Sequence, residues 1–267
     1  MTKQLIVANW KNHPDSLAEA VEILDSADKY LGSLSEAERF GLIFCPPFVF
    51  TEEVGKILKT SHLEHQAELG AQDISIDDKT ALTGEVSGSM LCKLGVGYVI
   101  VGHSERRWKL NESNETVNKK LKAVLRNEMV PIVCIGERER DFSAEGGPAS
   151  DWKDFIKKQA KATFAGISAD EVARCVIAYE PVWAISTTPG ARSDTPESAA
   201  ESIFIIKEVL SKTYNLKPKT YLYGGSITSA NAREFLQNNQ FDGVLVGGAS
   251  VNKEEFVKIL SVVAELK

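Results

Sequence analysis

Three separated segments carry residues that could together move a proton beside a carbonyl group. Lys11 supplies a cation, His103 an imidazole and Glu180 a carboxylate, and each follows a short apolar run. A positioned carboxylate can remove a proton, an imidazole can exchange protons with oxygen atoms, and a lysine stabilises negative charge as it develops. These residue types together indicate proton transfer on a small anionic substrate.

Glycine-rich turns follow two later apolar runs and could bind the anionic part of such a substrate. Gly224-Gly225-Ser226 ends one run, and Gly247-Gly248 ends the next. Glycine lets the backbone approach a ligand closely, and free N–H groups at a helix start favour an anion. We expect Ser226, Gly247 and Gly248 to line a phosphate site.

Each of these residues also has an interpretation without function. Lys11 could be a solvated surface charge, His103 a hydrogen-bonded structural histidine, and Glu180 the end of a strand before Pro181. The glycine pairs could be tight turns. Their common placement favours a function, because residues without a shared role would not all follow apolar runs by chance.

The candidate residues need regular elements to hold them in place. Along the chain, short apolar runs alternate with segments that have the period of a helix. The predicted strands are Leu5–Ala8, Gly41–Cys45, Glu68–Ala71, Tyr98–Val101, Pro131–Ile135, Cys175–Tyr179, Lys219–Tyr223 and Gly243–Val246. The clearest helix starts are at Ser16, Asn114, Thr195, Thr228 or Ser229, and Asn252. The segment Arg138–Ser150 is predicted to be a surface loop.

Eight strand-then-helix units without a change in composition predict one α/β domain, a single (β/α)8 TIM barrel over residues 1–267. In such a barrel the residues that follow the strands meet at one mouth. An open doubly wound sheet is the alternative. It would more naturally place Gly-x-Gly-x-x-Gly after the first strand, where this chain has Asn9-Trp10-Lys11-Asn12.

Composition narrows the class of protein. The net charge of −6 argues against nonspecific nucleic-acid binding, and no apolar run approaches the length needed to span a membrane. The four cysteines form no Cys-x-x-Cys pair, and no histidine cluster suggests a metal. We therefore expect a cytoplasmic protein with reduced thiols, no cofactor and no metal.

Six segments, in order, resemble the triosephosphate isomerase family. They are Asn9-Trp10-Lys11, Gly102-His103-Ser104-Glu105-Arg106-Arg107, Cys134-Ile135-Gly136-Glu137, Ala178-Tyr179-Glu180-Pro181-Val182-Trp183-Ala184-Ile185, Tyr223-Gly224-Gly225-Ser226 and Gly247-Gly248-Ala249-Ser250. One tetrapeptide would be weak evidence, but six in order over residues 9 to 250 are specific.

The resemblance implies interconversion of dihydroxyacetone phosphate and D-glyceraldehyde 3-phosphate, in glycolysis and gluconeogenesis. It assigns Glu180 as the base, His103 as the group that polarises the carbonyl, and Lys11 as the cation that neutralises the substrate. Asn9 would help to hold the substrate oxygens, and Glu105 would sit behind the site and order either Lys11 or the network on the substrate side.

The resemblance also implies a mobile lid and a homodimer. The family's lid tip is Ile-Gly-Thr-Gly, whereas this chain has Ile185-Ser186-Thr187-Thr188-Pro189-Gly190. We expect an active enzyme in which Ser186 still binds phosphate, with altered lid kinetics or weaker phosphate affinity. The long loop 70–88 would carry Thr83 into the partner's site, near its Asn9 and Lys11.

Two alternatives remain open from the sequence. A Schiff-base aldolase barrel would want a lysine at the position of Glu180. A catalytically impaired barrel could serve as a dimeric binding or scaffold protein, and the altered lid is the motive for that hypothesis.

Overall fold

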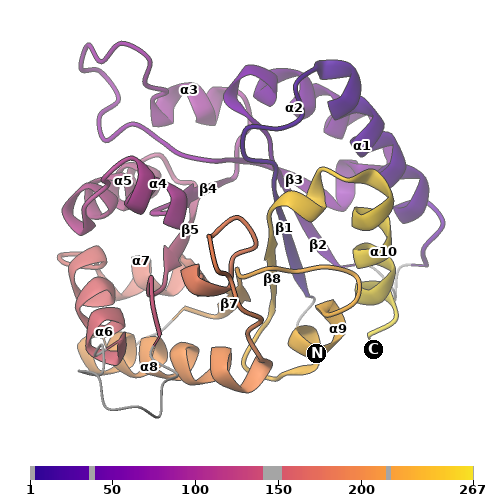
Figure 1. Ribbon diagram of the computed structural model, residues 1–267. Coiled ribbons are helices and arrows are strands. Elements are labelled where there is room, and N and C mark those ends of the chain that lie inside the picture. Colours follow the sequence, from indigo (N-terminus) through magenta and orange to yellow (C-terminus); the bar gives the residue numbers. More distant parts are fainter. Residues whose placement is uncertain (1–3, 36–39, 141–151, 215–217, 267) are drawn as a thin grey trace.

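Eight short parallel strands close into a barrel at the centre of the computed structural model (Figure 1). The structure describes residues 4–35, 40–140, 152–214 and 218–266. The strands are β1 (Leu5–Asn9), β2 (Gly41–Cys45), β3 (Ala67–Ala71), β4 (Tyr98–Val101), β5 (Val130–Ile135), β6 (Val176–Tyr179), β7 (Thr220–Tyr223) and β8 (Gly243–Val246). Strand β1 pairs with both β2 and β8, so the sheet has no free edge. The predicted TIM barrel is confirmed.

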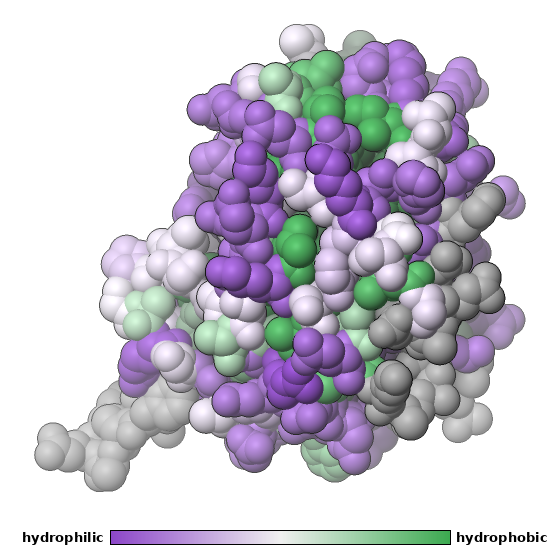
Figure 2. All heavy atoms as spheres, turned by 90° about the vertical axis from the view of Figure 1, so that its right-hand side faces the viewer, coloured by the Kyte–Doolittle hydropathy of each residue, from purple (hydrophilic) through white to green (hydrophobic). Residues whose placement is uncertain are grey.

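Helices surround the strands in Figure 1. They are α1 (Leu17–Leu31), α2 (Thr51–Thr60), α3 (Gly88–Lys93), α4 (Ser104–Lys109), α5 (Asn114–Arg126), α6 (Trp152–Thr163), α7 (Ala169–Arg174), α8 (Pro196–Tyr214), α9 (Ala232–Gln237) and α10 (Lys253–Ala264). No helix among the described residues is long and apolar enough to cross a membrane. The face that carries α1 and α10 is mostly hydrophilic, with hydrophobic side chains gathered at its upper edge (Figure 2).

The strands are buried on both faces, as their unbroken apolar runs predict. Alternate residues such as Val7, Ile100 and Leu222 point into the barrel and form one cluster. Their neighbours, such as Ile6 and Val101, pack outward against the helices in a larger cluster. This double burial fixes each strand in position, so that the residues after its carboxyl end have defined places at the mouth.

Several element ends differ from the prediction by one to three residues. Helix α5 is capped by Ser113, whose hydroxyl accepts from the Thr116 N–H, and Asn114 is its first residue. Helix α9 begins after Asn231 rather than after Thr228 or Ser229. Asparagine, serine and threonine are all good cap residues, so the sequence does not show which of several adjacent candidates caps the helix.

Other predicted ends are confirmed. Ser16 caps α1 by accepting from the Glu19 N–H, and Asn252 caps α10 in the same way. The Thr195 hydroxyl accepts from the Ser198 N–H at the start of α8. Of the predicted surface loop 138–150, all but residues 138–140 lie outside the described residues.

Candidate active site

The predicted site residues converge at the mouth of the barrel around a cavity of about 190 Å³. Its lining includes Asn9, Lys11, His103, Glu180, Ser186, Ser226, Gly247 and Gly248. Asn9 ends β1, and the others lie after β1, β4, β6, β7 or β8, so distant segments of the chain form the site. Glu105 lines a second cavity of about 390 Å³ that shares Asn9, Lys11 and His103 with the first.

Glu180 follows β6 and is buried, with only 2% of its surface exposed. Its Oε2 accepts a hydrogen bond from the Ser104 backbone N–H at 2.7 Å, and its Oε1 lies 3.0 Å from His103 Nε2. Burial disfavours the charged carboxylate, but the attraction of His103 and the hydrogen bonds outweigh it, so the pKa of Glu180 is lowered. The carboxylate is therefore ionised at neutral pH and can accept a proton.

His103 is the N-cap residue of α4, and its ring is fixed by the first turn of that helix. Its Nδ1 accepts a hydrogen bond from the Glu105 backbone N–H at 3.2 Å. A ring nitrogen that accepts carries no proton, so the hydrogen-bond network assigns the proton of a neutral imidazole to Nε2. This nitrogen is the one that lies 3.0 Å from Glu180 Oε1.

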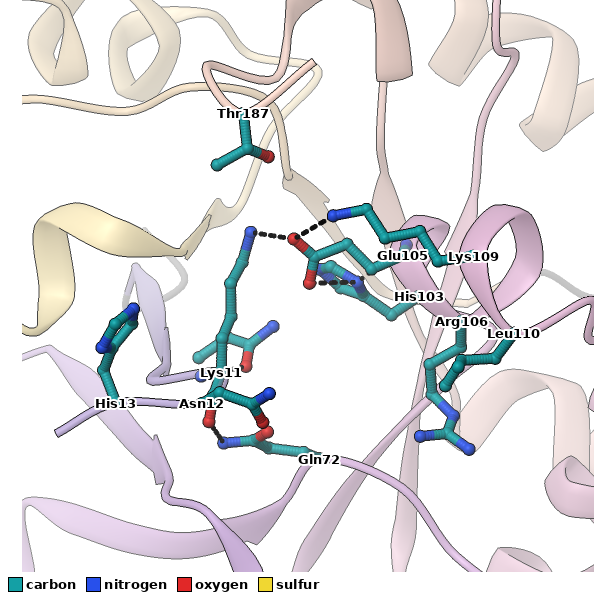
Figure 3. Close-up of a pocket in the computed structure, with 11 residues that line it drawn as sticks. Lys11, Asn12, His13, Gln72, His103, Glu105, Arg106, Lys109, Leu110 and Thr187 are labelled. Atoms are coloured by element: carbon teal, nitrogen blue, oxygen red, sulfur yellow. Dashed lines mark hydrogen bonds and ion pairs between the residues drawn. The ribbon is translucent and has the colours of Figure 1, made fainter. Parts of the chain in front are cut away.

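Lys11 reaches the same space from the loop after β1. Its ammonium group lies 3.0 Å from Glu105 Oε1, and the more exposed Lys109 lies 3.9 Å from the same atom (Figure 3). The backbone of Lys11 has a φ of 55°, a conformation that few residues other than glycine adopt. Gln72 donates to the Lys11 carbonyl at 2.8 Å, and the Asn9 side chain accepts from the Lys11 N–H at 3.1 Å. These bonds stabilise a strained backbone at the site.

The candidate phosphate region lies between the lid, which we define as residues 181–195 between β6 and α8, and the loops after β7 and β8. The Ser186 backbone N–H donates to the Ser226 hydroxyl at 2.7 Å. A Cβ on Gly247 would lie 3.0 Å from Lys11 Cε, so glycine leaves room for the lysine side chain there. Thr187, also on the lid, lines the larger cavity (Figure 3).

Thr83 is the one predicted site residue that does not line either of these cavities. It lies in the loop between β3 and α3, which stands away from the barrel at the upper left of Figure 1. Residues 79–85 of this loop are all exposed. Within a single chain, Thr83 therefore has no place at the active site.

Sequence reasoning missed the groups that hold Glu180 in position. The Ser104 N–H binds its carboxylate, and a Cβ on Gly136 would lie 1.8 Å from the Glu180 carbonyl oxygen. A Cβ on Gly224 would lie 3.0 Å from Glu180 Cγ. Gly136 and Gly224 belong to segments that resemble the family, but nothing in the sequence linked either glycine to the position of Glu180. A backbone N–H donor cannot be recognised from the sequence, because every residue except proline carries one.

The fold and this arrangement define the class: a (β/α)8-barrel enzyme with a buried carboxylate, an imidazole and a lysine at one mouth. The triosephosphate isomerase family model matches residues 4–263. The chain therefore belongs to the triosephosphate isomerase family.

Individual relatives agree with the family model over the whole barrel. The triosephosphate isomerase of Alkaliphilus oremlandii is 39% identical over 264 residues, covering 98% of this chain and 100% of the relative. That of Caldanaerobacter subterraneus is 37% identical, with 98% and 100% covered. A crystal structure of the Bartonella henselae triosephosphate isomerase superposes with a TM-score of 0.78 at 29% identity, covering 97% of this chain and 98% of the other.

Proposed function

We propose that the chain interconverts dihydroxyacetone phosphate and D-glyceraldehyde 3-phosphate through an enediolate. The observation that carries this proposal is the 3.0 Å separation of Glu180 Oε1 and His103 Nε2, beside Lys11 in one cavity. Family membership supports the substrate. Glu180 takes the proton from the carbon beside the carbonyl and returns it to the neighbouring carbon, so the hydrogens of the product balance those of the substrate.

In this proposal His103 donates its Nε2 proton toward the carbonyl oxygen and passes protons between the two oxygens. Lys11 stabilises the substrate dianion and the negative charge of the enediolate, with Asn9 beside it. Glu105 orders Lys11 through their 3.0 Å ion pair. The position of donors around the developing oxyanion lowers the barrier, because they need no rearrangement during the reaction.

The phosphate group would bind the backbone N–H groups of Ser186, Gly247 and Gly248 and the Ser226 hydroxyl. The Ser186 N–H already has a hydroxyl oxygen as its partner, 2.7 Å away. A phosphate oxygen can replace that acceptor, and the Ser226 hydroxyl can then donate to the same anion. Closure of the lid would exclude water from the carboxylate and the substrate.

The direct test is turnover of D-glyceraldehyde 3-phosphate by the purified chain, produced in a host that lacks its own isomerase. We expect turnover in the wild type and a fall in kcat of about 10²-fold or more in Glu180→Gln, because a general base contributes about that much. Turnover that Glu180→Gln leaves unchanged would refute the assignment of the base. Undetectable turnover in the folded wild type would favour the scaffold alternative.

We further propose that the chain acts as a homodimer, in which the loop carrying Thr83 enters the 390 Å³ cavity of a second copy. The cavity is open beside Lys11, and the loop tip is exposed. Apolar side chains near these loops are also exposed: Val49 by 82%, Met90 by 58% and Leu82 by 44%. Exposed apolar groups of this kind are typical of a surface that another chain covers.

The dimer can be tested by sedimentation of the wild type and of Thr83→Arg. We expect the wild type to sediment as a dimer and the variant to dissociate and lose activity in parallel. Val49→Asp is a second variant that leaves the loop tip intact and should dissociate in the same way. A fully active monomer would contradict the proposal. We also propose a cytoplasmic location, for which the four unpaired cysteines are the support.

A further inference from the structure

Both ends of the lid contact one buried residue that is not part of the lid. Arg140 lies in the loop after β5 and is 6% exposed. Its guanidinium stacks on Trp152 of α6, 3.6 Å from the ring centroid. It also donates to the Ser202 hydroxyl at 2.7 Å and to the Ser198 carbonyl at 3.1 Å, both on α8. Arg140 is therefore fixed to the helices around the barrel.

The first end of the lid reaches Arg140 through a buried carboxylate. Trp183 Nε1 donates to Glu137 Oε1 at 2.9 Å, and the same oxygen lies 3.5 Å from Arg140 Nε. Glu137 is 1% exposed, and burial raises its pKa, although the hydrogen bonds and the Arg140 charge oppose that effect. The Arg140 cation stabilises the negative charge of the buried Glu137 carboxylate, which accepts the hydrogen bond from Trp183.

The second end of the lid reaches Arg140 through its backbone. The Arg192 guanidinium donates to the Arg140 carbonyl at 3.2 Å, and the Arg192 N–H donates to the Trp183 carbonyl at 3.0 Å. The guanidinium groups of Arg140 and Arg192 each lie 5.9 Å from the centre of the Trp183 ring. The Arg140 charge also acts on the carboxylate of Asp194, two residues further on. The two ends are thus tied together and tied to the same anchor.

We propose that Arg140 is a positioning residue for the lid, which acts through Glu137 and Trp183 at one end and through Arg192 and Asp194 at the other. This proposal rests on the isomerase function proposed above. With Arg140 in place, both ends hold the geometry from which the lid carries the Ser186 N–H to the phosphate. Without its guanidinium, Glu137 is left as a buried charge without the Arg140 cation, and Asp194 loses the same charge. Only the backbone bond from Arg192 to residue 140 then remains of the common anchor.

The test compares Arg140→Met with Arg138→Met, a matched control two residues away. Arg138 is exposed, lies over the ring of Trp108 and pairs with Glu139 rather than with a lid residue. For each variant, kcat and KM are measured with D-glyceraldehyde 3-phosphate and with D-glyceraldehyde, which has no phosphate for the lid to hold. We expect Arg140→Met to lower kcat/KM for the phosphorylated substrate about 10- to 100-fold, as misplaced positioning groups do. Turnover of D-glyceraldehyde and all constants of Arg138→Met should stay within about twofold.

Glu137→Gln provides the second arm, because it keeps an acceptor for Trp183 and removes the buried charge. If Arg140 acts through that charge, the double variant Glu137→Gln/Arg140→Met should recover part of the lost kcat/KM. It also remains measurable if Arg140→Met alone does not fold. Equal losses with both substrates, or no loss with either, would overturn the proposal. Neither result would contradict the proposed isomerase function. That function is contradicted only if the wild type itself shows no turnover.

Discussion

Shortening Glu180 by one methylene is the sharpest test of the proton-transfer geometry. In Glu180→Asp the carboxylate retracts by about 1.5 Å, the length of one C–C bond. The contacts with Ser104 N at 2.7 Å and His103 Nε2 at 3.0 Å would then lengthen beyond hydrogen-bonding distance unless the backbone follows. The backbone cannot follow easily, because the Glu180 N–H donates to the Ile135 carbonyl at 2.9 Å and its carbonyl packs against Gly136.

A displacement of this size should cost about 10²-fold in kcat, or about 2.7 kcal/mol of transition-state stabilisation. KM should change little, because the carboxylate does not form part of the proposed phosphate site. The assay couples dihydroxyacetone phosphate formation to NADH oxidation. Glu171→Asp is the matched control, since Glu171 lies in the exposed capping box of α7. A kcat for Glu180→Asp within about threefold of the control would refute the reasoning that position limits the rate.

Three further predictions concern the thiols, the pH dependence of stability and the lid. Cys92 should be the one thiol of four that reacts with Ellman's reagent in the native protein, because the others are buried and burial raises their pKa; a second thiol reacting at a similar rate would contradict this. The lowered pKa of Glu180 means that its ionisation stabilises the fold above the ordinary value of 4.5, and that this contribution is lost as pH falls through the lower folded value. The difference in melting temperature between wild type and Glu180→Gln should therefore shrink toward zero on acidification below 4.5, and a constant difference would show that the charge is not responsible. Gly190 has a φ of 73°, so Gly190→Ala should cost about 1–2 kcal/mol in this lid conformation and raise KM several-fold, whereas Gly166→Ala, with a φ of 69° away from the lid, should leave KM unchanged.

The sequence predicted the barrel because each strand carries its own signal. Runs such as Leu5–Ala8 and Gly243–Val246 are short and apolar throughout. This pattern is expected of a strand whose two faces are both buried. Even the weakest run, Glu68–Ala71, forms β3. The boundaries were less certain, because polar residues that can cap a helix occur in clusters, as at Thr228, Ser229 and Asn231.

The placement of side chains at the mouth could also be predicted, but their supports could not. Lys11, His103 and Glu180 were predicted from their types and from their positions after strands, and all three line one cavity. Arg140 gave no signal, because its role depends on tryptophans and serines that lie 12 or more residues away in the chain. Such partners become visible only when the fold brings them together. The roles assigned to these residues stay predictions, as does the extent of the domain over residues 1–267.

One short helix accounts for the relation between the two groups proposed to move protons. The backbone N–H of Ser104, the first residue of α4, binds the Glu180 carboxylate, and the N–H of Glu105, the second, binds His103 Nδ1. Unpaired amides at a helix start favour negative charge on the carboxylate and an acceptor nitrogen on the imidazole. The bond from Ser104 adds to the attraction of His103 in keeping the carboxylate ionised, and the bond from Glu105 leaves His103 Nε2 facing that carboxylate. Because both partners are held by consecutive amides of one element, the backbone geometry of that element sets the distance between them.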